Sequence, residues 1–214
     1  MKRLLGTVLL ALSALAMGAA AGVLTVGYFS GGDLAGWESE EFKGLTTYGL
    51  VEMDGRKVLK AVSHGSASAL IKKIEADPAK TPMLSWSWKI QGTLPGGDGR
   101  TKAGDDFAAR VYVVFPSFLF WNTRALTYVW ANQLPVGRVW PNAFAGDNVM
   151  MMALNSGDGR AGQWVSHRRD LAADFRRCFG EEPGAIGAIA VMTDSDNTKD
   201  QAVGYYGDIT LGPK

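Results

Sequence analysis

The sequence predicts an all-β protein, namely a β-sandwich with one short helix. Short apolar or alternating runs recur between turn residues along the chain, which is typical of half-buried strands. Asp-Gly, a pair that favours tight hairpin turns, occurs at 54–55, 98–99 and 158–159. One segment has the apolar spacing of a helix. Many short strands with a single helix favour a sandwich over a fold that alternates strands and helices.

Strands are expected where the short apolar runs lie. Their approximate positions are residues 24–30, 45–53, 56–63, 67–74, 83–91, 106–115, 124–132, 148–155, 161–168, 186–193 and 203–211. The helix is expected to begin after Asp170, a good capping residue, and to end at Gly180. Leu171, Phe175 and Cys178 lie at helical spacing between these two residues.

Alternation within a strand predicts which side chains face the core. In the segment 106–115 one set is apolar throughout and is expected inside, namely Phe107, Ala109, Val111, Val113 and Phe115. The opposite set contains Asp106, Arg110 and Tyr112 and is expected on a polar face. A sheet with one apolar and one polar face needs a second sheet to cover it, as in a sandwich.

Length and charge limit the classes of function. The chain has 214 residues, of which 47% are apolar, so it can bury a substantial core. We expect residues 22–214 to form a single domain, because no linker-like stretch divides them. The formal net charge is +1 and basic residues do not gather in a large cluster, so no nucleic-acid partner is expected.

Residues 1–21 have the parts of a secretory signal peptide. Lys2 and Arg3 form a charged start, an apolar run follows, and cleavage is expected after Ala21. The alternative is an uncleaved membrane anchor, because apolar residues continue nearly to Val26. After cleavage we expect no membrane span and a periplasmic or secreted protein. Cys178 is the only cysteine, which fits a periplasmic protein without disulfides, and it is expected to be a small core residue.

Several short elements of the chain resemble a bacterial exported family. They are residues 36–37, 59–61, 66–68, 82–88, 102–112, 140–143, 191–198 and 206–209. The segment from Lys102 to Tyr112 is the most specific of them. Over roughly residues 27–211 the chain resembles domain-of-unknown-function family 3047. This resemblance implies an exported, single-domain protein and brings no established activity with it.

The two ends of the domain are similar to the first and last strands of jelly-roll carbohydrate-binding modules. The opening carries Tyr28 and Phe29, and the close is the segment 205–211. The similarity implies a jelly-roll-like β-sandwich. In such modules an aspartate of the closing strand often helps to hold a structural calcium ion, and Asp208 would have that role here. The exposed aromatic platform of a cellulose- or xylan-binding module is not evident in the sequence.

A first polar cluster is a candidate ligand-binding site. It consists of Asp105, Asp106, Arg110 and Tyr112 in and beside one expected strand. Two side chains of the following strand extend it if their face is the same one, namely Trp130 and Asn132. The alternative is a structural network in which aspartate and arginine join a loop to the sheet.

A second candidate site follows the strand that ends near residue 193. Asp194 and Asp196 place carboxylates at alternate positions, with Asn197 beside them, a pattern that suits a hard cation or a polar ligand. The glycine and distal glutamate of a complete calcium-binding loop are missing. The alternative is a strand that ends in an ordinary polar turn.

The motifs of several enzyme classes are absent from the sequence. It contains no Gly-x-Ser-x-Gly elbow, no phosphate-binding loop and no dinucleotide fingerprint, and its 2 histidines do not suggest a conventional zinc site. The favoured hypothesis is therefore a non-catalytic domain that binds a glycan or another small polar ligand. One alternative is a hydrolase or lyase of envelope polysaccharide that uses two of Asp105, Asp106, Asp194 and Asp196.

Loop aromatics leave another alternative open. Trp121 and Trp140 are expected in loops, where an indole can stack on a sugar ring. The apolar segment 118–121 can equally dip into a membrane surface or cover one end of the sandwich. An exposed apolar patch there would indicate a structural or partner-binding protein of the envelope.

Overall fold

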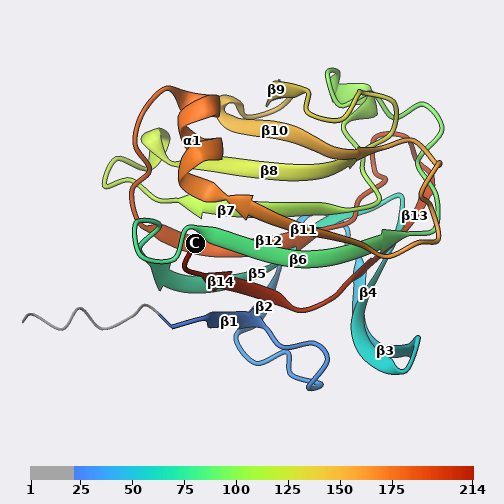
Figure 1. The fold of residues 1–214 in the computed structure, drawn as a ribbon. Helices are drawn as coiled ribbons and strands as arrows, with labels where there is room; N and C mark the ends of the chain where they lie inside the picture. The colour runs from blue at the N-terminus through green and yellow to red at the C-terminus, as the bar shows by residue number, and fades with distance from the viewer. Residues whose placement is uncertain (1–21) are drawn as a thin grey trace, which may run out of the picture.

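The computed structural model describes residues 22–214, apart from the side chain of Phe120. The expected signal peptide, residues 1–21, lies outside the described residues. Fourteen strands of the described chain form two seven-stranded sheets that pack face to face (Figure 1). The expected jelly-roll-like β-sandwich with one short α-helix is therefore confirmed. Between residues 22 and 214 no helix has both the length and the apolar character needed to cross a membrane.

Sheet I has the strand order β1-β14-β6-β13-β4-β3. Its strands are β1 (Leu24–Gly27), β3 (Thr47–Met53), β4 (Arg56–His64), β6 (Met83–Ile90), β11 (Val165–Asp170), β13 (Gln201–Tyr206) and β14 (Ile209–Gly212). β6 is its centre, because β13 and β14 share one edge of β6 and β11 pairs along the other.

Sheet II has the strand order β2-β5-β12-β7-β8-β10-β9. Its strands are β2 (Trp37–Lys43), β5 (Ala67–Ala76), β7 (Arg110–Phe115), β8 (Arg124–Ala131), β9 (Val139–Asn142), β10 (Gly146–Ser156) and β12 (Ile186–Met192). β8 and β10 are parallel, and the other neighbours are antiparallel. Two short 3-10 helices lie in loops, η1 (Lys102–Gly104) and η2 (Phe120–Asn122).

The helix α1 (Leu171–Phe179) lies against β8 and β11 and so joins the two sheets (Figure 1). The Asp170 carboxylate accepts a hydrogen bond from the Ala173 amide at 3.0 Å, which caps the first turn. Gly180 ends the helix with a left-handed φ of 73°. Both helix limits expected from the sequence are confirmed.

The main core fills the space between the sheets. The alternation of β6 sends Leu84, Trp86, Trp88 and Ile90 inward, as the sequence predicts. Tyr128 and Trp130 of β8 meet these side chains from sheet II. Because interior side chains interlock at high density, this aromatic layer holds the two sheets in one relative position.

His167 of β11 belongs to this aromatic layer. Its ring packs against Trp86 and Trp88 at 5.3 and 5.2 Å, and its Nε2 lies 2.8 Å from the Asn155 side-chain oxygen. Burial, with Arg169 and Arg160 nearby, lowers the pKa of His167 to about 4. The folded state therefore favours the neutral imidazole.

We expect His167 to contribute to the loss of stability in acid. Its folded-state pKa lies below the unfolded value of about 6.5, so the stabilisation is complete above that pH and is lost as the pH falls toward 4. Denaturant unfolding between about pH 7 and about pH 4.5 measures this slope. In His167→Gln the slope is expected to be shallower, and an unchanged slope contradicts the assignment.

The structure contains two strands that the sequence did not predict. β2 has the sequence WESEEFK and is mostly exposed at the edge of sheet II, so it lacks the apolar alternation by which strands are recognised. β9 is short, includes Pro141 and lies at the other edge. Edge strands are stabilised by one neighbour and need little apolar surface of their own.

Three local expectations need correction. Asp54-Gly55 does form the tight turn between β3 and β4, but the pairs at 98–99 and 158–159 lie in loops instead of hairpin turns. β7 begins only at Arg110, and Phe107 packs in a second cluster with Trp140 instead of in the main core. The expected strand 203–211 is interrupted between β13 and β14.

Candidate functional site

The outer face of sheet II carries an open pocket of about 540 Å³, which we call the sheet II pocket. It is lined by Phe42, Lys43, Ala67, Asp105, Arg110, Tyr112, Asn142, Phe144, Ala145, Val149, Met192, Asp194, Asp196 and Asn197. Its size lies within the roughly 300–1,000 Å³ typical of small-molecule sites. Six of the residues expected at a ligand site from the sequence are among those that line it.

Strand register explains why these side chains meet. Arg110 of β7 pairs with Met192 of β12, which pairs in turn with Ala69 of β5. Side chains at paired positions point to the same face of a sheet, so all three lie on the outer face. Tyr112 lies two residues after Arg110 and shares this face. Ala67 of β5, two residues before Ala69, lines the hollow beside the larger Tyr112 and Met192.

Arg110 is the centre of a buried ion network at the floor of the pocket. It is 2% exposed, and Asp194 and Asp105 are 1% and 4% exposed. The guanidinium makes two hydrogen bonds to the Asp194 carboxylate, one of them from Nε at 2.9 Å. It also donates to the Asp105 carboxylate at 3.4 Å and to the Asp105 carbonyl. Two carboxylates and one guanidinium therefore hold each other in place beneath the pocket.

Burial and mutual charge set the protonation of this network. Burial alone would lower the pKa of Arg110, but Asp194, Tyr112 and Asp105 raise it well above its usual value. Arg110 is thus a permanent cation. Burial raises the pKa of Asp105 and Asp194, and the adjacent guanidinium acts in the opposite direction. Burial also raises the pKa of Tyr112 to about 12, so its hydroxyl stays protonated at neutral pH.

Asp106, also expected at the ligand site, does not line the sheet II pocket and has a different role. It is fully buried, and its carboxylate accepts hydrogen bonds from the amide and side chain of Asn197 and from the amide and hydroxyl of Thr198. The distances lie between 2.5 and 3.3 Å. Asp106 therefore fixes the loop that presents Asp194 and Asp196. The loop can contribute to a site only because Asp106 holds it in place.

Three carboxylates come together at this point. Asp106, Asp194 and Asp196 each place one oxygen within 4.8 Å of the others. Two of these carboxylates already form ion pairs within the protein. Asp194 pairs with Arg110, and the Lys43 amine lies 3.4 Å from the Asp196 carboxylate. The two expected clusters thus form one site, in which each of the three carboxylates already has a protein donor.

Two exposed rings at the mouth of the pocket were missed in the sequence. Phe42 is 62% exposed and Phe144 is 57% exposed, and both line the sheet II pocket. Phe42 belongs to the unpredicted edge strand β2, and Phe144 follows Asn142, whose side-chain oxygen accepts from the Phe144 and Ala145 amides. The sequence did contain one indication for Phe42, namely an apolar ring in a segment that is otherwise rich in charged residues.

Trp130, Asn132 and Trp140 lie outside the sheet II pocket. Trp130 is 1% exposed in the main core and donates to the Gly157 carbonyl. Asn132 donates to the Asp106 carbonyl and accepts from the Leu94 amide, so it fixes a loop. Trp140 is 5% exposed and donates to the Gly99 carbonyl. The face of β8 that carries Trp130 is the inner face, which alternation alone did not decide.

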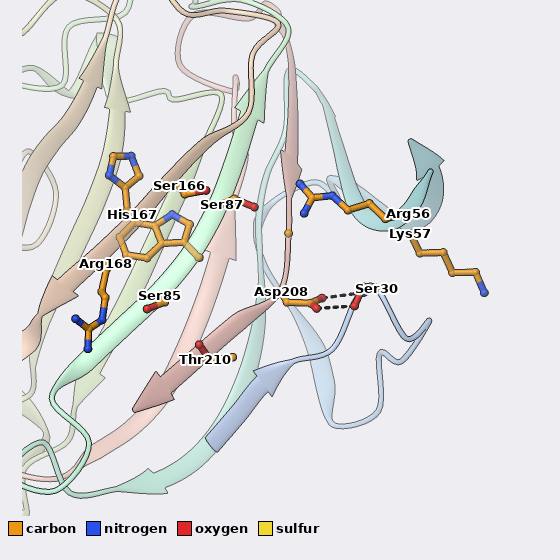
Figure 2. Close-up of a pocket in the computed structure, with 12 residues that line it drawn as sticks. Ser30, Arg56, Lys57, Ser85, Ser87, Ser166, His167, Arg168, Asp208 and Thr210 are labelled. Carbon is orange, nitrogen blue, oxygen red and sulfur yellow. Dashed lines mark hydrogen bonds between the residues drawn. The ribbon is translucent and has the colours of Figure 1, made fainter. Parts of the chain in front are cut away.

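Asp208 is on the other side of the sandwich, in the break between β13 and β14. Its carboxylate accepts hydrogen bonds from the amide and the hydroxyl of Ser30, at 2.8 and 2.5 Å (Figure 2). These bonds connect the loop after β1 to the closing strand. Within residues 22–214 it is not part of a group of carboxylates close enough to share an ion. Calcium at Asp208 stays a prediction.

Known structures with a similar arrangement of strands include sugar-binding and sugar-cleaving domains. A mutant of the family 29 carbohydrate-binding module CBM29-2 is 9% identical, with 90% of this chain and 92% of that chain covered and a TM-score of 0.44. A variant of the Rhodothermus marinus cellulase Cel12A is 10% identical, with coverages of 92% and 97% and a TM-score of 0.48. The xyloglucanase domain of NopAA from Sinorhizobium fredii is 10% identical, with coverages of 92% and 99% and a TM-score of 0.46. Similarity at this level carries no argument about ligand or activity.

Sequence comparison gives a firmer result. No curated protein sequence matches the chain significantly. A family model matches residues 35–210, which include every strand from β2 to β13 and all the residues that line the sheet II pocket. The chain therefore belongs to the family described as "Protein of unknown function (DUF3047)".

Proposed function

We propose that this protein is a non-catalytic binding protein that holds a glycan or a similar polar ligand in the sheet II pocket. One observation supports the proposal above the others. An open pocket combines two exposed phenylalanine rings at its mouth with a rigid polar floor built on Arg110. Sites for small ligands have this composition, in which apolar walls supply contact and a few fixed polar groups supply orientation.

The chemistry of the pocket fits a sugar. The Phe42 ring can pack against the C–H face of a pyranose, and the Phe144 ring, with the Lys102 amine 5.4 Å from its centroid, can add apolar contact beside it. The pocket is also lined by the Tyr112 hydroxyl and by the ion pair of Lys43 and Asp196, which offer donors and acceptors to ligand hydroxyls. The floor is held by the sandwich and needs little rearrangement on binding, which lowers the entropic cost.

The competing proposal is a polysaccharide hydrolase or lyase. Carboxyl groups with raised pKa values in a pocket, here Asp105 and Asp194, are a feature of general acids. Against catalysis, both oxygens of Asp194 accept hydrogen bonds from Arg110, and both oxygens of Asp105 are used by Arg110 and Asn142. Carboxyl groups held in this way are poorly placed to exchange protons with a substrate, so binding is the stronger proposal.

We further propose that the protein acts in the periplasm or outside the cell. The charged start, the apolar run and the small residues that end at Ala21 support this location. Envelope polysaccharides and their fragments are then the ligands within reach.

We expect Phe42→Ala and Phe144→Ala to weaken glycan binding by at least about tenfold, which corresponds to about 1.4 kcal/mol. The reason is that each change removes an apolar surface that the ligand covers, while the exposed ring contributes little to folding. The measurement is a screen of wild-type protein on a broad polysaccharide array, followed by titration of the strongest ligand. Phe118→Ala is the matched control, because Phe118 is fully exposed and follows the far end of β7.

A silent array, or a ligand that the two pocket variants bind as well as the wild type does, contradicts the proposal. In that event a partner-binding role gains weight, because Phe118, Leu119 and Trp121 are exposed together in the loop between β7 and β8. Hydrolysis of an array polysaccharide by the purified protein would favour the enzyme.

A further inference from the structure

The outer face of sheet I carries a second open pocket, of about 480 Å³, on the opposite side of the sandwich from the sheet II pocket. We call it the sheet I trough. Figure 2 shows serine and threonine hydroxyls along it, with Arg168 on one side and Arg56 and Lys57 on the other. It differs from the sheet II pocket in that its exposed side chains are polar or cationic. Trp86 borders it, but that side chain is buried in the main core.

Strand alternation builds the floor of the trough. The inward turn of Trp86 and Trp88 sends Ser85 and Ser87 to the outer face of β6. Pairing places Ser85 between Arg168 of β11 and Thr210 of β14, and it places Ser166 beside Ser87. The hydroxyls of the four floor residues make no side-chain hydrogen bond to any residue between 22 and 214; these are Ser85, Ser87, Ser166 and Thr210. They are available to a ligand.

The cations at the two ends are not neutralised by the protein. Within the described residues, Arg56, Lys57 and Arg168 have no carboxylate partner within ion-pair distance. Asp208 also lines the trough, but it already accepts two hydrogen bonds from Ser30. The trough is therefore positive overall, with two separated positive ends.

Both ends have defined positions. The Arg56 guanidinium lies 4.5 Å over the Trp164 ring, and the Arg168 guanidinium donates to the Pro213 carbonyl at 3.1 Å. The ends lie on β11 and β4, and the order β11, β6, β13, β4 separates these strands by three steps. At about 4.8 Å a step, the ends are roughly 14 Å apart. A single small anion cannot contact both ends at once.

We propose that the sheet I trough binds an extended acidic polysaccharide, with carboxylate groups at the two cationic ends and sugar hydroxyls along the serine row. Guanidinium groups pair with carboxylates through two parallel hydrogen bonds, and serine and threonine hydroxyls both donate to and accept from sugar hydroxyls. A single-stranded nucleic acid fits less well, because such ligands are held largely by stacking on exposed aromatic rings. The face of Trp164 is covered by Arg56, and Trp86 is buried.

The test is a titration of the intact protein with polygalacturonate, at low and at raised salt. Dextran serves as the neutral polysaccharide, and polyphosphate serves as a polyanion without carboxylates. Binding to polygalacturonate that weakens with salt is expected, together with no dextran binding that the variants of the trough cations weaken. Arg168→Ala and the double variant Arg56→Ala, Lys57→Ala are each expected to weaken it about fivefold or more, as the loss of roughly 1 kcal/mol predicts. Lys73→Ala is the matched control, because it removes one exposed charge on sheet II.

Each outcome decides the proposal. Equal weakening by Lys73→Ala shows unspecific attraction to the whole surface and overturns it. Binding of polyphosphate in preference to polygalacturonate overturns the choice of a carboxylate ligand, and absence of binding overturns the site. Phe42→Ala and Phe144→Ala are expected to leave polygalacturonate binding within about twofold, so failure at the trough is distinguishable from failure at the sheet II pocket.

Discussion

Arg110→Ala is expected to lower the free energy of unfolding by about 3–5 kcal/mol, because it leaves two buried carboxylates without their cation. Asp194 and Asp105 are almost fully buried and both accept hydrogen bonds from this guanidinium. Removal of one partner of a buried ion pair costs far more than the net contribution of the pair, since the remaining charge cannot return to water. Urea unfolding at neutral pH measures the change.

The matched control is Arg100→Ala. Arg100 also pairs with an aspartate, Asp98 at 2.8 Å, but its side chain is 57% exposed, so a change of at most about 1 kcal/mol is expected. Arg110→Met combined with Asp105→Asn and Asp194→Asn should recover part of the lost stability, because the buried charges are removed together. An Arg110→Ala protein as stable as the wild type would show that the network contributes nothing to the scaffold.

Asp106→Ala is expected to lower the free energy of unfolding by roughly 3 kcal/mol or more, because two backbone amides and two side chains lose their common acceptor. Those donors belong to Asn197 and Thr198, which join the strand end at Asp194 to the rest of the loop. The loop amides should also lose protection against hydrogen exchange. Chemical denaturation and hydrogen exchange by mass spectrometry measure the two effects.

Asp208→Ala is the comparison for Asp106→Ala. Asp208 also accepts hydrogen bonds from a loop, but those bonds lie at the exposed surface, so a smaller loss of about 1 kcal/mol is expected. If both substitutions lower the free energy of unfolding by the same amount, the burial of Asp106 does not account for its contribution to stability. If Asp106→Ala leaves the loop protected, another contact holds the loop.

Much of the fold followed from local pattern. The alternation in β6 correctly assigned the inner and outer faces, and Asp170 and Gly180 correctly bounded α1. Edge strands such as β2 were not predicted, because pairing with one neighbouring strand stabilises them and they need no apolar face that a sequence pattern could reveal. The irregular start of β7 was not predicted. There, hydrogen bonds to the Asp106 and Asp194 carboxylates replace the regular strand pattern, and each of them joins residues that are distant in sequence.

The sequence predicted the charged and polar residues of the candidate site but not its two exposed phenylalanines. Unusual charged residues on and beside a strand drew attention to Arg110 and Asp194, and the structure brings them together. Which face of β8 carries Trp130 depends on sheet packing, so alternation could not decide it. The exposure of Phe42 and Phe144 is a property of the assembled surface, and a single phenylalanine in a sequence has no signal of that kind.

Chemical-shift mapping tests the central claim most directly. Isotope-labelled protein, titrated with the glycan that binds most strongly on the array, should show its largest shifts in the rings and methyl groups of Phe42, Tyr112, Phe144 and Met192, which line the sheet II pocket. The loop residue Phe118 should not shift. Shifts centred on Phe118, or none at saturating glycan, would contradict the proposal that this pocket is the ligand site.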